Sequence, residues 1–422
     1  MNTTFIPSPE SIAFRNALEQ RRNIFLTGPG GTGKSYLLEK AVREWLSNPS
    51  ITASTGVAAL RVGGSTVHRW SGMMLGPKPG QSNVECFNEL LLDKHRSVRA
   101  GFNRIRQCSV LIIDEISMLS GRAFGFLDFL CRQLRKTDEP FGGIQIIVSG
   151  DFLQLPPVCK NRSQPYDWAF LTPSWSEAQF VPIYLQKIHR QQNQQFVEAL
   201  AAFRLGEVKG SHAALLHSRV CNFPDGNITR LLTHNSQVDR WNDYRLGELP
   251  GEPQEFLAAL EGPESQQKSL IDNLLTPQVL RLKVGARVMF TVNRTDDGFV
   301  NGQTGVVHNL WDDEIIVESQ GAFIRVEPFC WRFDPKDPGS ATFTQFPLRL
   351  SYAMTIHKSQ GLTLDSAYVD VRAAREPGQA YVALSRLRSI EGLHLKDWFS
   401  GVFVSKAAKQ FYDSLNKQEV AA

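Results

Sequence analysis

The segment Gly28-Pro-Gly-Gly-Thr-Gly-Lys34-Ser35 follows an apolar run at residues 24–26 and opens a helix-like stretch that extends to residue 45. In such a strand–loop–helix setting, glycines let successive backbone N–H groups turn around an anion, and the helix start adds its dipole. The pattern predicts a phosphate-binding loop in which Lys34 reaches the outer phosphates and Ser35 ligates magnesium. The sequence therefore predicts a nucleoside triphosphate as ligand. The loop residues are Gly28, Gly30, Gly31, Thr32, Gly33, Lys34 and Ser35.

A second motif, Leu111-Ile-Ile-Asp114-Glu115, is an apolar run that ends in two carboxylates. Such a run is typical of a buried strand in a parallel sheet. Beside a phosphate-binding loop, Asp114 can hold magnesium through water, and Glu115 can orient or deprotonate the attacking water. On its own the pair also fits a surface acidic pair after a core strand. The phosphate-binding loop favours the catalytic interpretation.

Three further side chains are candidates for catalysis. Gln154 follows the next apolar strand, and its amide is placed to sense the terminal phosphate; a polar loop residue before the prolines at 156–157 is the alternative. Arg190 and Arg386 are candidates to stabilise charge on a transferred phosphoryl group, a role worth about 10³–10⁵ in rate. From spacing alone, both also fit ordinary surface arginines.

The composition is that of an ordinary globular protein. The 422 residues exceed the size at which one core stops growing, so we expect two or more domains. The chain has 42% hydrophobic and 21% charged residues, and its net charge of +4 permits a polyanion partner without requiring one. The six cysteines form no C-x-x-C pair, and the nine histidines form no i, i+4 pair around a carboxylate. We therefore expect reduced thiols and no zinc site.

We expect no targeting segment or membrane span in this sequence. No apolar run approaches the ~18–20 residues that a membrane span needs. The first residues, MNTTFIPSPESIAF, lack the basic start and apolar core of a signal peptide and are not an Arg-rich transit peptide. We therefore expect a cytoplasmic, nucleoid-associated protein of prokaryotic or phage type, with no membrane partner.

Short apolar runs alternate with helical stretches in both halves of the chain, which predicts an α/β fold with parallel sheets. The runs of the first set are 23–27, 50–53, 110–114 and 144–150, and those of the second are 228–234 and 367–371. Within the second set, residues 282–292 alternate at period two, and Asn301-Gly-Gln-Thr-Gly305 is a hairpin signal. This region therefore predicts a small β-barrel-like insertion.

Residues 71–106 interrupt the alternation of the first set. A Gly/Pro-rich turn at 76–80 precedes a basic stretch at 94–106. Its basic residues are Lys94, His95, Arg96, Arg99, Arg104 and Arg106. The stretch fits either a DNA-binding surface or a solvated helical face.

Six runs of the sequence resemble the helicase motifs of superfamily one, subgroup B. They are GPGGTGKS (28–35), ITASTGVAALRVGGSTVHRWSG (51–72), LIIDEISML (111–119), PFGGIQIIVSGDFLQLPPV (140–158), LRLSYAMTIHKSQGLTLDSAYVDV (348–371) and QAYVALSRLRSIEGLHL (379–395). PFGGIQ leading into GDFLQLPPV is similar to the signature of the petite-integration-frequency (PIF) helicases. The resemblance covers roughly residues 10–400 in the expected order. Ser11 stands where the family has an adenine-reading glutamine, and His189 where it has a phenylalanine.

The resemblance implies two RecA-like domains with ATP in the cleft between them, single-stranded DNA across their tops and 5′-to-3′ translocation. It also implies a wedge-bearing insertion in the first domain and an SH3-like β-barrel in the second. The implied segments are 1–70 and 107–185 for domain 1A, 71–106 for insertion 1B, 186–279 and 336–422 for domain 2A, and 280–335 for insertion 2B.

Carried over by position, the resemblance gives each candidate residue a role. Lys34 and Ser35 bind phosphate and magnesium, and Gly361 joins the loop residues as a nucleotide contact. Asp114 and Glu115 serve magnesium and the attacking water. Gln154 senses the γ-phosphate, and Arg190 and Arg386 form the charge-stabilising pair.

Two sets of residues, one in each predicted domain, are candidates for DNA binding. Their hydroxyls, backbone N–H groups and rings can hold phosphates and stack bases without reading sequence. The residues are Thr55, Gly56, Thr66 and His68 in the first domain, and Thr355, His357 and Lys358 in the second. A buried histidine bonded to backbone is the alternative for His68, and Trp70, Trp168 and Trp175 are expected to be packing residues.

These features predict a monomeric ATP- and Mg²⁺-dependent 5′-to-3′ DNA helicase of the kind that acts in DNA repair, recombination and telomere maintenance. Its expected partners are single-stranded DNA and 5′-tailed or forked duplexes, with quadruplexes and RNA–DNA hybrids as further candidates. The alternatives are a DNA-stimulated translocase, an ATP-gated single-strand-binding module and a small-molecule kinase. RNA stays open as a track, since backbone and stacking contacts tolerate a 2′-hydroxyl.

Overall fold

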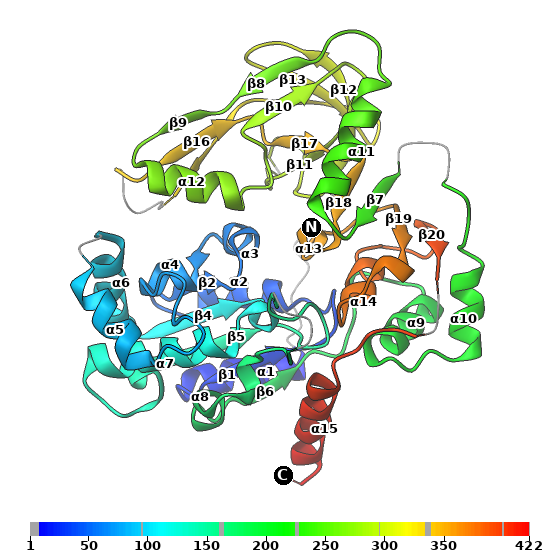
Figure 1. Ribbon diagram of the computed structural model, residues 1–422. Helices are drawn as coiled ribbons and strands as arrows, with labels where there is room; N and C mark the ends of the chain where they lie inside the picture. Colours follow the sequence, from blue (N-terminus) through cyan, green and yellow to red (C-terminus); the bar gives the residue numbers. More distant parts are fainter. Residues whose placement is uncertain are drawn as a thin grey trace. The chain divides into compact units, whose positions relative to one another are not determined.

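The protein is described by a computed structural model covering residues 8–93, 96–159, 164–223, 228–294, 296–333, 339–398 and 401–421. Its described residues divide into two compact units, and each is presented by itself (Figure 1). Unit 1 comprises Met1–His189, Glu376–Gly378 and Val404–Ala422, and unit 2 comprises Arg190–Arg375 and Gln379–Phe403.

Unit 1 is built on a parallel sheet. Among its described residues, six strands pair in the order β3-β2-β4-β5-β1-β6, and every pairing is parallel. The strands β4 and β5 are buried along their whole length, as expected for strands covered on both faces. The bounds are β1 (Ile24–Thr27), β2 (Ser50–Ala53), β3 (Ser65–Thr66), β4 (Val110–Asp114), β5 (Gln145–Ser149) and β6 (Val181–Tyr184). The α/β prediction and the four predicted strand runs of the first set are confirmed.

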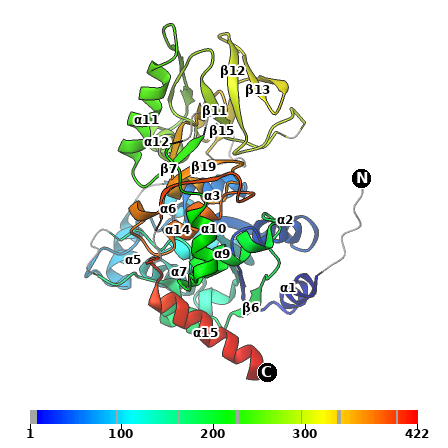
Figure 2. The same cartoon turned by 90° about the vertical axis from the view of Figure 1, so that its right-hand side faces the viewer.

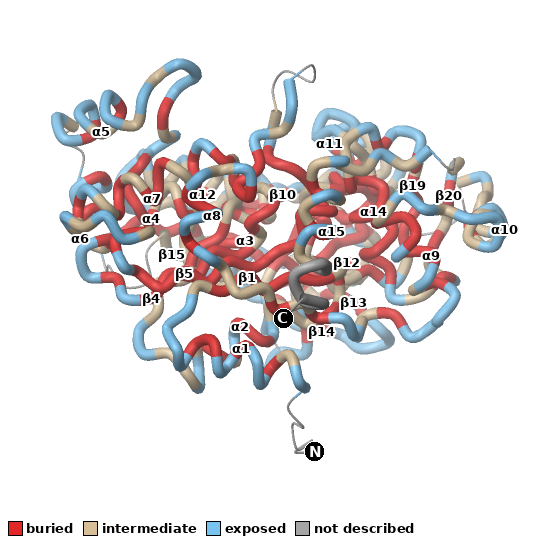
Figure 3. Tube along the Cα trace, turned by 90° about the horizontal axis from the view of Figure 1, so that it is seen from below, coloured by how far each residue is buried: buried red, intermediate tan, exposed pale blue. Residues whose placement is uncertain are grey.

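The helices of unit 1 flank this sheet, against which α1 and α2 pack their apolar faces (Figure 1). They are α1 (Pro9–Glu19), α2 (Lys34–Glu44), α3 (Gly56–Arg61), α4 (Val67–Ser71), α5 (Asn83–Leu92), α6 (Arg96–Gln107), α7 (Gly121–Arg135), α8 (Pro173–Glu177) and α15 (Lys406–Ala421). Short 3₁₀ turns are η1 (Ile116–Met118), η2 (Pro140–Gly143) and η3 (Ala169–Leu171). Exposed positions dominate α5, whereas buried positions run through the strands (Figure 3).

The predicted insertion at 71–106 contains α5 and α6, which pack against α7. Burial along α6 is confined to one face, and Arg104 of α6 donates to the carbonyls of Trp70 and Arg69 at 2.8 and 2.9 Å. Lys94 and His95 of the basic stretch lie outside the described residues. The wedge role and the boundaries of this insertion stay predictions. Trp70, Trp168 and Trp175 are all buried, which confirms them as packing residues.

Unit 2 contains a second parallel sheet, in the order β18-β7-β19-β20 for its described strands. The strands are β7 (Thr229–Leu232), β18 (Ala353–Thr355), β19 (Ala367–Asp370) and β20 (Leu393–Asp397). The accompanying helices are α9 (Gln194–Leu205), α10 (Gly210–His217), α11 (Asn235–Gly247), α13 (Ile356–Ser359), α14 (Gln379–Leu384) and the 3₁₀ turn η4 (Val371–Ala373). The helix α12 (Glu264–Asn273) lies instead against the antiparallel strands described next. The second α/β set of the sequence is thereby confirmed.

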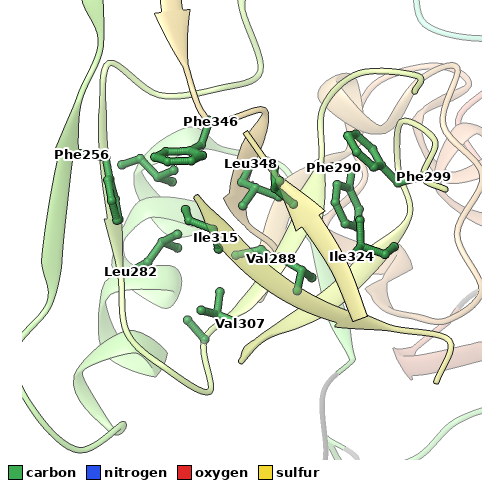
Figure 4. Packing of buried hydrophobic residues seen from close by; sticks show 14 of the residues in the cluster. Phe256, Leu282, Val288, Phe290, Phe299, Val307, Ile315, Ile324, Phe346 and Leu348 are labelled. Atoms are coloured by element: carbon green, nitrogen blue, oxygen red, sulfur yellow. The ribbon is translucent and has the colours of Figure 1, made fainter. Parts of the chain in front are cut away.

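Antiparallel strands form the insertion in unit 2, where β12 and β13 lie side by side (Figure 2). They are β8 (Gln254–Leu257), β9 (Ala259–Glu261), β10 (Val279–Leu282), β11 (Arg287–Phe290), β12 (Thr304–Leu310), β13 (Ile315–Ser319), β14 (Ala322–Val326), β15 (Phe329–Arg332), β16 (Thr342–Gln345) and β17 (Leu348–Leu350). Their shared core includes Phe290 stacked on Phe299, with ring centroids 4.4 Å apart (Figure 4).

The antiparallel region extends beyond the predicted limits of 280–335. On the N-terminal side β8 pairs with β10 and β9 with β16, and on the C-terminal side β17 pairs with β11. The alternating run at 282–292 falls on two strands, because the chain turns at Gly285, where φ is +84°. The outer strands are short and lack strict alternation, so their sequences gave no clear strand signal.

The C-terminal helix α15 corrects the assignment of residues 336–422 to one domain, because it belongs to unit 1. Its Phe411 stacks on Phe170 at 4.5 Å between ring centroids and also contacts Phe152. The hydroxyl of the next residue, Tyr412, lies 2.7 Å from the Thr27 hydroxyl at the end of β1. Contacts of these aromatic side chains therefore hold α15 against unit 1.

We expect Phe411→Ala to destabilise unit 1 by about 2–4 kcal/mol, because it removes a ring from an aromatic cluster and leaves a cavity. Urea unfolding followed by tryptophan fluorescence measures the change. Gln410→Ala, on an exposed position of the same helix, is the matched control. Equal stability of the two variants would contradict the packing of α15 described above.

Candidate active site

The predicted phosphate-binding loop joins β1 to α2 in a conformation that requires glycine. At Gly28 φ is +140°, and a Cβ there would lie 2.3 Å from the Leu185 carbonyl oxygen. Gly33, the residue before α2, is left-handed with φ +88°. Lys34 Nζ donates to the carbonyls of Gly28 and Pro29 at 2.7 and 2.9 Å, so the ammonium group lies over the loop.

The rest of the loop is fixed by local hydrogen bonds. The Thr32 hydroxyl donates to the Pro29 carbonyl at 3.0 Å. His189 stands where the similar helicase family has a phenylalanine, and its backbone N–H donates to the Gly31 carbonyl at 2.8 Å. The loop is therefore tied to the end of unit 1, directly before Arg190.

The two predicted acidic residues lie at the carboxyl end of β4. Asp114 is 2% exposed, and its Oδ1 accepts the N–H of Glu115 at 3.0 Å. Glu115 adopts a left-handed conformation with φ +53°, which is unusual for a residue other than glycine and typical of functional sites. The Ser54 hydroxyl donates to the Glu115 carbonyl at 2.6 Å, which links this turn to the end of β2.

Arg61, at the end of α3, connects both carboxylates with the loop serine. Its Nη2 lies 2.9 Å from Asp114 Oδ2, 3.3 Å from Glu115 Oε1 and 3.5 Å from Ser35 Oγ. Desolvation opposes the charge of Arg61, but the ion pairs with the two carboxylates outweigh it and raise its pKa. The structure thus brings Ser35, Asp114 and Glu115 around one point. Carboxylate and hydroxyl oxygens are the donors that Mg²⁺ prefers, so these residues fit that ion.

Gln154 lies after β5 and is buried. Its amide donates to Asp151 Oδ2 at 3.3 Å, and Asp151 Oδ1 accepts the Tyr412 hydroxyl at 3.3 Å. Gly378 packs so closely on this turn that a Cβ there would lie 2.4 Å from the Gln154 carbonyl oxygen. Gln154 is therefore held by neighbours from distant parts of the chain.

In unit 2, the two predicted arginines meet at Ser385. Arg190 Nη1 donates to the Ser385 carbonyl at 2.8 Å, and the same oxygen accepts from Gln191 Nε2 at 3.2 Å. Arg386 is 2% exposed; its Nε donates to the Val382 carbonyl and its Nη2 to the Ser385 hydroxyl, both at 2.8 Å. Gly361 lies in the turn after α13, with φ +82°.

The candidate DNA-binding residues share one local design in the two units. Thr66 ends β3 and caps α4, and Thr355 ends β18 and caps α13; each hydroxyl accepts the N–H of the residue three positions later. His68 and His357 are the second residues of the two capped helices. In unit 1, Thr55 precedes α3 and accepts the N–H of Ala58 at 3.2 Å. Gly56 opens that helix.

Electrostatics differ between these side chains. Burial lowers the pKa of His68, which favours a neutral imidazole. Burial, followed by repulsion from Arg349, lowers the pKa of Lys358. Arg349 and Arg287 are themselves buried, and each has an Nη1 without a hydrogen-bond partner among the described residues. Two buried cations of unit 2 are therefore incompletely hydrogen-bonded within the described residues, and Arg349 lies close enough to Lys358 to repel its charge.

Sequence reasoning missed three residues that organise these sites. Arg61 lies inside a motif quoted for other residues, and Gln191 directly follows Arg190. Tyr412 lies in a helix assigned to the other domain. Ser11, at the family's glutamine position, is buried, and its hydroxyl donates to the Ser8 carbonyl at 2.8 Å in the first turn of α1.

Comparisons with known proteins find one matching family model and several relatives. The family model described as PIF1-like helicase matches residues 10–212. The ATP-dependent DNA helicase Pif1 of Bdellovibrio bacteriovorus is 35% identical over 93% of this chain and 88% of that protein. The chain belongs to the PIF1-like helicase family.

Further PIF1-like relatives cover almost the whole chain. The ATP-dependent DNA helicase PIF1 of Danio rerio is 37% identical over 98% of this chain, which spans 64% of that protein. The crystal structure of Bacteroides Pif1 in complex with ADP-AlF4 has a TM-score of 0.85 and 30% identity, and the match covers 98% of each chain. The fold is therefore that of PIF1-like helicases in both units.

Proposed function

We propose that this PIF1-like chain is an ATP-dependent DNA helicase that translocates 5′ to 3′ on single-stranded DNA and unwinds duplex. The observation that carries the proposal is the grouping of Ser35, Asp114 and Glu115 around one point beside the Lys34 loop. These are the groups that phosphoryl transfer to water needs: a phosphate cradle, oxygen donors for a metal and a carboxylate for the attacking water.

Each residue of unit 1 has a proposed task. The loop N–H groups and Lys34 hold the phosphates, and Glu115 orients the attacking water and accepts its proton. Gln154 contacts the terminal phosphate. Ser35 and Asp114 would hold Mg²⁺, which neutralises charge on the phosphate oxygens when bound. Arg190 and Arg386 of unit 2 are proposed to stabilise charge on the transferred phosphoryl group.

Single-stranded DNA is the proposed track. Thr55, Gly56, Thr66 and His68 in unit 1, with Thr355, His357 and Lys358 in unit 2, would hold its backbone and bases. A related protein, Bacteroides Pif1, has been solved bound to single-stranded DNA. Forked duplexes, quadruplexes and RNA–DNA hybrids are proposed substrates, with α5 and α6 as the segment that blocks the displaced strand.

The proposed setting is a monomer that acts in DNA repair and recombination, free of the membrane. Within the described residues, no helix combines the length and apolar character that a bilayer span requires. A small-molecule kinase would also use the Lys34 loop. The second parallel sheet, with its capped Thr355 turn, favours a nucleic-acid track over a small substrate.

The test is strand separation of two partial duplexes, one with a 5′ single-stranded tail and one with a 3′ tail. Each is incubated with ATP and without nucleotide, for the wild-type chain and for Lys34→Ala. We expect only the 5′-tailed duplex to separate, only with ATP and only with the wild-type chain. ATP hydrolysis is measured in parallel, with and without single-stranded DNA.

Three other outcomes would each overturn a different part of the proposal. DNA-stimulated hydrolysis without strand separation would make the chain a translocase or an ATP-gated clamp. Hydrolysis that DNA does not stimulate would favour the kinase class. Separation of the 3′-tailed duplex alone would contradict the direction of translocation.

A further inference from the structure

Arg61 occupies an unusual position for a cationic side chain. The guanidinium Nη2 lies among three oxygens of the proposed active site, those of Ser35, Asp114 and Glu115. The side chain is 21% exposed, and the Asp114 carboxylate that it contacts is 3% exposed. The proposed hydrolytic chemistry gives Arg61 no task.

Nη2 lies next to both side chains that are proposed to hold the metal, Ser35 and Asp114. Mg²⁺ binds oxygen ligands at about 2.0–2.1 Å and demands near-ideal octahedral geometry. Mg²⁺ held by Ser35 and Asp114, directly or through water, would compete for the space beside their oxygens with the guanidinium nitrogen, which lies 3.5 Å from Ser35 Oγ and 2.9 Å from Asp114 Oδ2. Since both are cations, repulsion adds to the steric conflict. Arg61 and Mg²⁺ therefore exclude each other from this position.

Two features allow the Arg61 side chain to leave. Its Nε is buried and has no hydrogen-bond partner among the described residues, so the guanidinium is only partly satisfied where it lies. Ser35, Asp114 and Arg61 also line a cavity of about 250 Å³, which Glu39 and Arg43 line from α2. Glu39 supplies a second carboxylate there, at present 3.2 Å from Arg43.

We propose that the Arg61 guanidinium is an exchangeable cation. Without nucleotide it balances the charges of Asp114 and Glu115; when Mg²⁺ binds together with the nucleotide, the Arg61 side chain moves into the cavity toward Glu39. This inference deepens the proposed ATPase function and rests on it. This exchange raises the Mg²⁺ concentration needed to fill the site. Nucleotide phosphates supply additional ligands to Mg²⁺, and these let the ion displace the Arg61 guanidinium. Mg²⁺ alone displaces it poorly.

The test compares the full-length wild-type chain with Arg61→Met. Two quantities are measured: the thermal midpoint in EDTA and in Mg²⁺ alone, and the Mg²⁺ concentration that half-saturates binding of a fluorescent ADP. We expect Mg²⁺ alone to leave the wild-type midpoint unchanged and to raise that of Arg61→Met, which binds the free ion in its folded state. The half-saturating Mg²⁺ concentration should fall about tenfold in the variant, the factor expected for loss of one charge-assisted hydrogen bond.

Arg15→Met is the matched control, because Arg15 forms an exposed ion pair with Glu19 on α1 and does not line this cavity. It should behave as wild type in both measurements. Arg61→Lys keeps a positive charge and should keep the high Mg²⁺ requirement. An equal or higher Mg²⁺ requirement in Arg61→Met would overturn the exchange, as would stabilisation of the wild-type chain by Mg²⁺ alone.

A measurement on the wild-type chain covers the case in which Arg61→Met does not fold. The NMR signal of Arg61 Nε–H should shift with Mg²⁺ and ADP together and stay in place with Mg²⁺ alone. An unmoved signal under saturating Mg²⁺ and ADP would contradict the exchange. Absence of any ADP binding by the wild-type chain would instead contradict the proposed function, which separates the two failures.

Discussion

Arg386→Ala is expected to lower DNA-stimulated ATP hydrolysis by about 10³–10⁵-fold, the effect of removing an arginine that stabilises charge on a transferred phosphoryl group. Arg386 is suited to this task because its guanidinium is held in one place. Its Nε and Nη2 bond to the Val382 carbonyl and the Ser385 hydroxyl, and Arg190 and Gln191 fix the Ser385 carbonyl. Such fixed charge needs little reorganisation as the reaction proceeds.

The measurement is steady-state hydrolysis with saturating single-stranded DNA, together with affinity for fluorescent ADP. Because Arg386 is buried, its loss also affects stability, so thermal midpoints are recorded and rates are compared well below them. Arg388→Ala is the control: Arg388 lies two residues away and forms an exposed ion pair with Asp365 at 3.0 Å. Hydrolysis within tenfold of wild type in a folded Arg386→Ala chain would remove Arg386 from the proposed chemistry.

The parallel sheets could be predicted from the sequence because their strands are buried on both faces. Residues 110–114 form an unbroken apolar run up to Asp114, and all five are buried in β4. The carboxyl ends of such strands carry the functional loops, so one pattern placed both the strand and the acidic pair. The same logic located Lys34 and Ser35 at the end of β1.

Other features depend on contacts that no local pattern reveals. Arg61 reaches Asp114 across 53 residues of sequence, and its own segment indicates only a short helix. Phe411 and Tyr412 follow unit 2 in the sequence but pack on unit 1, because their aromatic partners Phe152 and Phe170 lie there. The antiparallel insertion extends beyond the predicted limits of 280–335 for the same reason: the strands at 254–261 pair with strands that are distant in the sequence.

Glu115→Gln should lower hydrolysis by about 10²–10⁴-fold while ATP binding persists, because glutamine keeps the size of the side chain but cannot accept a proton from water. The left-handed backbone at Glu115, with φ +53°, is supported by the Ser54 hydroxyl on its carbonyl. This backbone conformation orients the Glu115 side chain and does not depend on the charge of the carboxylate. The variant should therefore retain the local geometry and fail in chemistry alone.

Single-turnover hydrolysis and equilibrium ATP binding separate these two effects. Glu19→Gln is the control, because Glu19 is an exposed carboxylate on α1 that pairs with Arg15 and does not line the cavity beside Arg61. If Arg61 balances both carboxylates, Glu115→Gln also frees one of its two ion pairs and lowers the Mg²⁺ requirement for nucleotide binding. A variant that binds ATP with that lower requirement and cannot hydrolyse it would support the role of Glu115 and the exchange at Arg61 together. Loss of ATP binding would instead mean that the Glu115 carboxylate is needed to bind ATP and not only to hydrolyse it.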